Sequence, residues 1–372
     1  MSFKLREKTI LIISPESWGM NKVSKHHYAL ELSDRGNRVF FLNPPILRRK
    51  QFVPDIETIN NRLKVINYRP LVRGTNHFPY YIRKKFQSPD AKIIKCLIDK
   101  NIDILWSFDP YRFQYMQAFG AGVNLYHAVD VHRSRLEVDI SRNADCILCS
   151  SDKILKRFIG LDCPHFKINH GLAQHFVCED IVPKTKNLTS KVRVGYVGNL
   201  DYQYLDVMTL RTIVRENPSV DFHFIGPYGE SNLNPYDSRS NILVFLKERS
   251  NVQLLGPKNS KDLPNLLRNY DLFLMCYSGD KNVSEMANPH KILEFLSTGK
   301  VVVSHYIDEY RDKRDLVEMV DNNCFLPGTF RNVVENLGYF NSTKKMQKRI
   351  EFARSNMYSA HLRKVGSIIN SL

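Results

Sequence analysis

The sequence predicts an α/β protein with two domains, each built around a parallel β-sheet. The first observation is a strand–helix–strand pattern: the apolar run Thr9–Ile13, a helix from about Lys22 and the strand Arg38–Leu42. A continuous apolar run is typical of a strand buried on both faces, and the connecting helix makes the two strands parallel. The second observation is that a polar segment, residues 180–190, precedes a new strand and the same alternation.

The elements then follow in order. The remaining strands expected in the first domain are residues 63–68, 102–107, 122–127, 146–150 and 166–169, with helical stretches between most of them. The second domain is expected to contain strands at 192–198, Asp221–Ile225, 252–255, 271–276 and Val301–Ser304, and helices at about 205–216, 262–269 and 289–298. We therefore expect two Rossmann-like αβα domains that face each other across a cleft. Their predicted bounds are residues 1–182 and 190–345, followed by a helical segment, 346–372, that crosses back to the first domain.

The chain carries an excess of positive charge. Its 54 Lys and Arg residues against 38 Asp and Glu residues give a formal net charge of +16. Much of the excess lies in residues 46–86, where the acidic residues are Asp55 and Glu57 and the basic ones are Arg48, Arg49, Lys50, Arg62, Lys64, Arg69, Arg73, Arg83, Lys84 and Lys85. A surplus of this kind indicates an anionic partner, either nucleic acid, anionic lipid or a phosphorylated substrate.

Cysteines and apolar runs indicate a cytoplasmic protein. Seven scattered cysteines form no disulfide framework, and the close pair Cys146 and Cys149 lies in an apolar stretch typical of a buried strand. No apolar run approaches the ~18 residues that span a bilayer, and Thr9–Ile13 is too short for a signal-peptide core.

The loops after the strands are the expected ligand sites, because open α/β sheets bind ligands at the carboxyl ends of their strands. The turn Gly195-Tyr-Val-Gly-Asn-Leu200 would let backbone N–H groups approach a phosphate, or it is simply a tight turn. The strand Thr9–Ile13 is not followed by a dinucleotide-binding glycine pattern, which argues against an NAD enzyme.

The most specific stretch is Asn288-Pro-His-Lys-Ile-Leu-Glu-Phe-Leu-Ser-Thr-Gly-Lys-Val-Val-Val-Ser304. Pro289 suits the first turn of a helix, and Lys291 and Glu294 share one face of that helix. A lysine at a helix start opposes the helix dipole, so Lys291 is better explained by a bound anion. Glu294 could accept hydrogen bonds from both hydroxyls of a ribose. The alternative is a solvated Lys–Glu pair.

This stretch resembles the donor-binding segment of GT-B glycosyltransferases. The resemblance is strongest to the family 4-like, group 1 enzymes that build bacterial surface polysaccharides, including the teichuronic-acid type. It extends to most of the chain, through segments that begin at Trp18, Tyr126, Ala144, Ile168, Val194, Phe222 and Leu255. The family carries two glutamates, of which the second matches Glu294. Met286 stands at the position of the first and Glu285 is one residue away, so that acid is either shifted by one residue or absent.

The resemblance implies transfer of a sugar from a nucleotide-diphosphate donor, UDP more than GDP, with retention of anomeric configuration. Implied donor-binding residues are Gly198, Asn199, Lys258, Asn288, Lys291 and Glu294. Basic groups and helix N-termini would neutralise the leaving diphosphate without a metal, and the sequence has no D-x-D pair for a cation. No cofactor is expected.

The first domain is expected to bind the acceptor, a saccharide or a lipid-linked one. His127 would contact the donor sugar, and Asp130 would orient or deprotonate the acceptor hydroxyl, unless the two merely cap a strand end. Trp18, Ser24 and His26 would contact the acceptor. Basic residues interleaved with aromatic ones are typical of a membrane interface, so Arg48, Arg49, Lys50, Arg83, Lys84 and Lys85 are predicted to dock on anionic lipid. A solvated basic loop is the alternative.

Three alternatives are open at this point. The first is a catalytically inactive GT-B scaffold, which would bind a nucleotide without turnover. A sugar-nucleotide 2-epimerase of the same fold would bind the same donor but need no acceptor. A basic nucleic-acid-binding protein would use the same charges, although the sequence contains no helix-turn-helix, zinc-finger or RNP-like signal, so we expect no nucleic acid partner.

Overall fold

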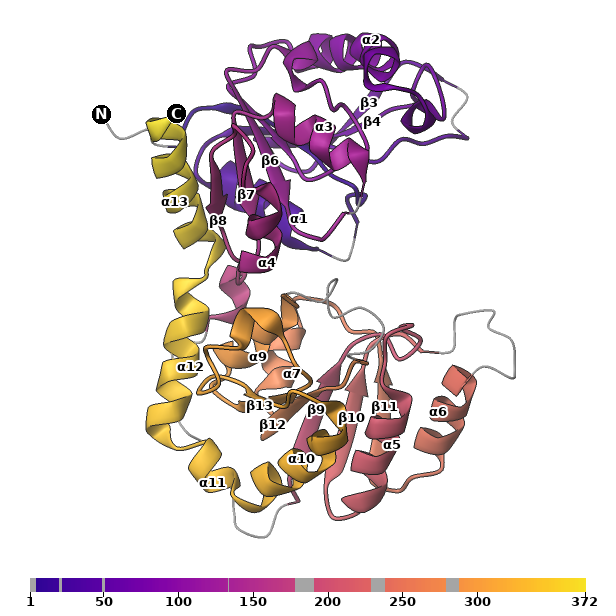
Figure 1. Cartoon of the computed structure of the whole chain (residues 1–372), viewed down its shortest axis with the longest axis vertical. Coiled ribbons are helices and arrows are strands. Elements are labelled where there is room, and N and C mark those ends of the chain that lie inside the picture. The colour runs from indigo at the N-terminus through magenta and orange to yellow at the C-terminus, as the bar shows by residue number, and fades with distance from the viewer. Residues whose placement is uncertain are drawn as a thin grey trace. The chain divides into compact units, whose positions relative to one another are not determined.

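The computed structural model describes residues 5–19, 22–48, 51–132, 134–177, 191–228, 238–278 and 288–372. The chain divides into two compact units. Unit 1 consists of Met1–Gly171 together with Tyr358–Leu372, and unit 2 of Leu172–Met357 (Figure 1). Each unit is built on a sheet that is parallel apart from one edge pair in unit 1, so the predicted α/β class with two Rossmann-like domains is confirmed.

Unit 1 contains an eight-stranded sheet with the order β3-β4-β2-β1-β5-β6-β7-β8. The antiparallel pair in this sheet is β3 with β4 at one edge, and all its other pairs are parallel. The strands are β1 (Thr9–Ile13), β2 (Arg38–Leu42), β3 (Asp55–Thr58), β4 (Leu63–Asn67), β5 (Ile104–Ser107), β6 (Val123–Ala128), β7 (Cys146–Cys149) and β8 (His165–Lys167). The strands β1, β5 and β7 are buried throughout, as continuous apolar runs require.

The helices of unit 1 include one that comes from the far end of the sequence. They are α1 (Ser24–Asp34), α2 (Tyr80–Ile98), α3 (Arg135–Asn143), α4 (Asp152–Leu155) and α13 (Tyr358–Ser371). Helix α13 packs on α1: the Tyr28 hydroxyl lies 3.3 Å from His361 Nδ1, and Arg35 donates to the Ser359 carbonyl at 2.8 Å. The end of the chain is therefore part of the core of unit 1.

Unit 2 contains a six-stranded parallel sheet with the order β11-β10-β9-β12-β13-β14. The strands are β9 (Arg193–Val197), β10 (Asp221–Ile225), β11 (Val252–Gly256), β12 (Leu272–Met275), β13 (Val301–Ser304) and β14 (Glu318–Met319). The helices are α5 (Val207–Glu216), α6 (Ser238–Lys247), α7 (Leu263–Leu267), α9 (Lys291–Ser297), α10 (Leu326–Glu335), α11 (Leu337–Phe340) and α12 (Thr343–Ser355). Helix α12 packs against α9, where Met346 and Ile350 lie over Gly299.

The structure differs from the prediction mainly in residues 46–98. A strand at 63–68 and a basic surface for lipid docking were predicted in this part, and the structure also holds the edge strand β3 and the long helix α2 there. Pro89 lies inside α2, and a proline at such a position normally argues against a helix because it removes a backbone donor. The buried residues Ala91, Ile94 and Ile98 anchor α2 on the core nevertheless.

Candidate functional site

The carboxyl edge of the unit 2 sheet is formed by the ends of β9, β10, β12 and β13. These strands pair in parallel, so all of them end at the same edge. Helix α9 connects the neighbouring parallel strands β12 and β13 (Figure 1). A connecting helix of this kind begins at the carboxyl edge of the strands, so its first residue, Lys291, belongs to this edge.

Lys291 and Glu294 are half-buried at the start of α9, whose other side chains Ile292, Leu293 and Phe295 are buried. Within the described residues, neither charged group has a hydrogen bond or an ion pair, and the two do not lie within 4.0 Å of each other. Burial raises the pKa of Glu294 to about 7, and Lys291 partly opposes this shift. Burial also lowers the pKa of Lys291, against the attraction of Glu294. Charges with so little exposure normally have partners, so this pair is the candidate ligand-binding group at this edge.

The turn after β9 is held by β10. The N–H of Gly198 donates to the Ile225 carbonyl at 2.9 Å, and the N–H of Leu200 donates to the Pro227 carbonyl at 3.1 Å. Gly226 has a φ of +141°, and a Cβ there would lie 2.1 Å from the Gly198 oxygen, so only glycine fits. The N–H groups of Gly198 and Leu200, which were expected to approach a phosphate, are therefore already bonded within the protein. In the described part of this turn, only the Asn199 N–H lacks an acceptor.

The other predicted donor residues lie at different points of unit 2. The side chain of Asn199 is exposed and accepts from the Asp201 N–H, which closes the turn. Lys258 is exposed and follows β11, the edge strand of the sheet. Asn288 is half-buried and comes just before α9. The uncertain pair Glu285 and Met286 lies outside the described residues.

Two side chains at the same edge were missed by the sequence analysis. Tyr277 follows β12 and His305 follows β13, with ring centroids 5.1 Å apart. Burial lowers the pKa of His305 to about 4, so its ring is neutral. Their position in the sequence could have identified them, because each lies directly beyond the carboxyl end of a predicted strand, where ligands bind in this kind of sheet.

His127 lies in β6 and is only 1% exposed, so the expectation that it faces a ligand at the strand end is not met. Its ring packs against Phe108, Tyr28 and Trp106, with centroid distances of 4.8, 5.7 and 6.0 Å. Neither ring nitrogen has a hydrogen-bond partner of ordinary geometry within the described residues, although the Ile168 backbone is close. Burial holds the pKa of His127 well below its ordinary value.

Asp130, in contrast, is exposed just beyond the end of β6. The same loop carries His132, whose Nδ1 lies 3.1 Å from the Tyr111 hydroxyl after β5. Asp130 is therefore exposed at the carboxyl edge of the unit 1 sheet, and its role toward an acceptor hydroxyl stays a prediction.

The predicted acceptor residues at the start of α1 differ in their accessibility. His26 is fully buried: its Nδ1 accepts from the Val23 N–H, and its Nε2 lies 3.1 Å from the Ser17 carbonyl. The prediction that His26 contacts the acceptor is wrong in this structure, because backbone groups occupy both ring nitrogens. Trp18 is half-buried against His26, and Ser24 is half-buried at the first position of α1.

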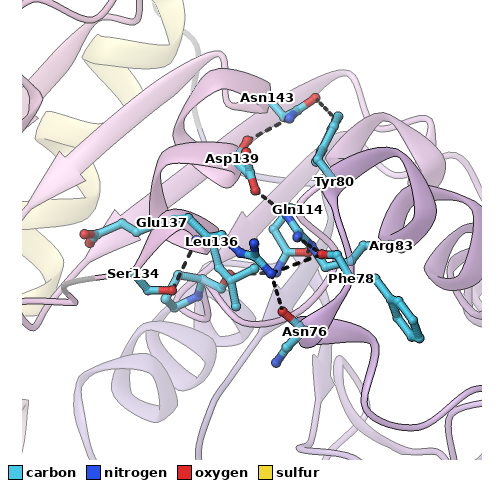
Figure 2. Close-up of polar contacts among 12 residues, drawn as sticks. Asn76, Phe78, Tyr80, Arg83, Gln114, Ser134, Leu136, Glu137, Asp139 and Asn143 are labelled. Carbon is cyan, nitrogen blue, oxygen red and sulfur yellow. Dashed lines mark hydrogen bonds and ion pairs between the residues drawn. The ribbon is translucent and has the colours of Figure 1, made fainter.

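Arg83 was predicted to be part of an exposed basic patch, and this prediction is also wrong. Its side chain is 1% exposed and makes an ion pair with Asp139 of α3 (Figure 2). It also donates to the Phe78 carbonyl at 2.5 Å and to Gln114 Oε1 at 3.3 Å. The network extends to Asn143, which accepts from the Tyr80 hydroxyl at 3.0 Å (Figure 2). Arg83 thus joins α2 to α3.

The rest of the predicted patch is exposed where it is described. Arg48, Lys84 and Lys85 are exposed, whereas Arg49 and Lys50 lie outside the described residues. Exposed apolar side chains surround the loops after β2 and β4: Ile46, Leu47, Phe52, Val53 and Leu71. In the part of the chain that the structure describes, no helix is both long and apolar enough to cross a membrane.

The close cysteine pair lies in β7, as the apolar pattern predicts. Cys146 and Cys149 are both fully buried, and burial raises the pKa of Cys146 to about 12. Two protonated, buried thiols are typical of a strand core rather than of metal ligands.

Comparison with known proteins identifies the fold. No protein-family model and no curated protein matches the chain. A solved sucrose-phosphate synthase from Thermosynechococcus elongatus matches with a TM-score of 0.71 and 13% identity over 98% of both chains. HepE from Anabaena, solved with UDP and glucose, matches with a TM-score of 0.66 and 14% identity over 98% of this chain and 99% of that one. The lipopolysaccharide galactosyltransferase WaaB matches with a TM-score of 0.63 and 14% identity over 98% and 100%. The chain therefore has the GT-B glycosyltransferase fold.

Proposed function

We propose that the protein is a glycosyltransferase that moves a sugar from a nucleotide-diphosphate donor to a saccharide or lipid-linked acceptor. The observation that carries the proposal is the half-buried couple Lys291 and Glu294 at the carboxyl edge of the unit 2 sheet, neither of which has a partner among the described residues. A nucleotide supplies what both groups lack, because its ribose hydroxyls donate to the carboxylate and its phosphates accept from the ammonium group.

UDP is the favoured nucleotide. HepE, which shares the fold, was solved with UDP and glucose. In the proposed reaction, the bond between the sugar and the diphosphate breaks, and the acceptor oxygen forms the new bond to the sugar while its proton passes to Asp130. Lys291 and the Asn199 N–H stabilise the negative charge that develops on the diphosphate. Retention of configuration and independence from a metal follow the family resemblance and belong to the proposal.

The acceptor binds to unit 1, where Asp130 is exposed and can accept a hydrogen bond from the acceptor hydroxyl group. Exposed apolar and basic side chains on the loops after β2 and β4, together with Lys84 and Lys85 of α2, favour an acceptor carried by lipid in an anionic membrane, as in surface polysaccharide synthesis. In this proposal the protein acts peripherally at the cytoplasmic face of that membrane.

A thermal-shift panel with UDP, GDP, ADP and CMP tests the donor site. A ligand at 100 times its Kd stabilises a protein by about 2.7 kcal/mol, so a bound nucleotide is readily seen. We expect a shift with UDP that is lost in Lys291→Ala and Glu294→Gln but kept in the matched controls Lys344→Ala and Glu335→Gln, which change exposed residues of unit 2. UDP release that depends on an added acceptor separates a transferase from an epimerase. Undiminished UDP binding by both site variants would refute the donor site.

Sedimentation with phosphatidylglycerol vesicles tests the membrane surface. We expect the double variant Lys84→Ala/Lys85→Ala to bind these vesicles less than the wild type and to keep its UDP affinity. The variant Lys344→Ala/Lys364→Ala removes two exposed charges elsewhere and serves as the control. Equal vesicle binding by the two double variants would contradict the role of α2 in docking.

A further inference from the structure

A pocket of about 130 Å³ lies within unit 1 and is not used by the mechanism above. It is formed by the loops that follow β2, β4 and β5 and by α2, so it opens near the carboxyl edge of the sheet. Its lining includes Leu47, Tyr68, Asn76, Asp90, Tyr111 and Phe113. At ~10–15 Å³ for each water position, the pocket has room for roughly ten water molecules, which is comparable with one sugar ring and its hydroxyl groups.

The pocket contains hydrogen-bond acceptors that lack donors. Asp90 is 6% exposed; its Oδ1 accepts from the Leu71 N–H at 3.1 Å, and within the described residues it forms no ion pair. Burial raises the pKa of Asp90 to about 6, so its carboxylate remains charged at neutral pH. Asn76 Oδ1 is buried and has no hydrogen-bond donor in the described part of the chain. A ligand that brings several hydroxyl donors would satisfy these groups.

The other charges around the pocket argue against an anion. Arg112 belongs to the lining, but its guanidinium group is held by Asp109 Oδ2 at 2.6 Å, by the Asn43 carbonyl at 2.9 Å and by Ser14. Arg73 is exposed and donates to the Leu47 carbonyl. Arg112 is thus neutralised by Asp109, whereas the buried Asp90 has no ion pair among the described residues, and its carboxylate repels a phosphate or an acid.

Aromatic side chains form the apolar part of the wall. Tyr68 and Phe113 lie with their ring centroids 6.0 Å apart, and Tyr111 lies beside them. Sugar rings present polar edges and apolar C–H faces, so a carboxylate, an amide oxygen and aromatic walls together suit a neutral sugar. A simple cation would find one carboxylate and few other oxygen ligands.

The pocket is connected to the loop that carries Asp130. The Tyr111 hydroxyl is 3.1 Å from His132 Nδ1, and the two rings meet edge to face at 5.3 Å. His132 is two residues from Asp130, the residue placed to receive the acceptor hydroxyl. We propose that this pocket binds one neutral sugar unit of the acceptor and thereby selects which acceptor is glycosylated. The inference rests on the proposed function, because that function makes unit 1 the acceptor side.

Saturation-transfer NMR on the full chain tests the pocket directly. The probes are the methyl glycosides of glucose, galactose, mannose, N-acetylglucosamine and N-acetylgalactosamine. We expect at least one of these glycosides to bind. Val72→Trp should abolish this binding because the larger side chain fills the pocket. Asp90→Asn should weaken the binding about tenfold, because hydrogen bonds to a neutral amide replace those to a carboxylate. Asp90→Asn keeps the oxygen that accepts from Leu71, so it should fold even if Val72→Trp does not.

Asp99→Asn is the matched control, since Asp99 is exposed at the C-terminal end of the same helix and does not line the pocket. Each variant is also titrated with UDP. Glycoside binding that is lost or weakened in the pocket variants, with UDP binding unchanged, supports the proposal. If no methyl glycoside binds the wild type, or if Asp90→Asn binds as tightly as Asp99→Asn, the proposal is overturned while the donor site stands. Absence of UDP binding would instead refute the proposed function. Octyl glycosides that bind more tightly than methyl glycosides would support an acceptor sugar presented on a lipid.

Discussion

Replacing Glu294 with glutamine should make unit 2 more stable at neutral pH while it removes nucleotide binding. The pKa of Glu294 rises from 4.5 to about 7 in the folded protein. A tenfold change in proton affinity corresponds to about 1.4 kcal/mol, so ionised Glu294 costs the folded state about 3 kcal/mol. The folded protein binds more protons than the unfolded chain between pH 4.5 and 7, so the stability of unit 2 falls as the pH rises through this window. Glutamine does not ionise, and the variant should lose this dependence.

The two tryptophans allow the effect to be assigned to one unit. Trp18 and Trp106 are the tryptophans of the chain, and both lie in unit 1, so urea unfolding followed by their fluorescence reports unit 1. Hydrogen exchange of β12 and α9, followed by mass spectrometry, reports unit 2. On going from pH 5 to pH 8, we expect the wild type to lose about 2 kcal/mol of unfolding free energy relative to Glu294→Gln in unit 2, with no change in unit 1.

Glu335→Gln is the control, because it changes an exposed glutamate at the end of α10 and should behave like the wild type. The reasoning fails if Glu294→Gln keeps the pH dependence of the wild type. It also fails if the difference appears in the tryptophan signal instead.

Three further outcomes are expected. Nucleotide binding requires ionised Glu294, so the Kd for UDP should increase about tenfold from pH 8 to pH 6, measured by calorimetry; a constant Kd would exclude Glu294 as a ribose ligand. Arg83→Met should lower the free energy of unfolding of unit 1, measured in urea, by about 2–4 kcal/mol, because Asp139 is left without its partner. An unchanged free energy of unfolding would indicate that Arg83 is a solvated surface residue. Gly226→Ala should lower the stability of unit 2 by at least about 1–3 kcal/mol, because the new Cβ meets Gly198; unchanged hydrogen exchange in β9 and β10 would show that the turn tolerates a side chain.

The strands could be predicted from the sequence because their apolar runs are continuous. The bounds of β1, β2, β10 and β13 agree with the prediction, and those of β4 to β9, β11 and β12 differ by a few residues at their ends. The short edge strands β3 and β14 were not predicted. The same continuous apolar pattern explains why His127, predicted to face a ligand, is buried instead. A strand that is apolar on both faces gives no signal for which face a polar residue occupies, and this histidine faces the Tyr28 and Phe108 side.

The role of Arg83 could not be predicted because its partner is distant in the sequence. Asp139 is 56 residues away, and local charge patterning shows only three adjacent basic residues. The pocket around Asp90 was missed for the same reason, since it is assembled from loops after three strands together with α2. By contrast, Lys291 and Glu294 belong to one short helix, so their spacing already placed them on one face.

The return of α13 to unit 1 has a consequence for synthesis on the ribosome. Tyr28 and His361 meet across 333 residues of sequence, and all of unit 2 lies between them. At about 5–20 residues per second, unit 2 takes roughly 10–40 s to emerge, and during that time the face of α1 that α13 covers has no partner. Unit 2 is a continuous segment and can fold first. The edge of unit 2 that carries Lys291 and Glu294 can therefore form on the nascent chain before unit 1 is complete, while exposed α1 is the surface that a chaperone would protect.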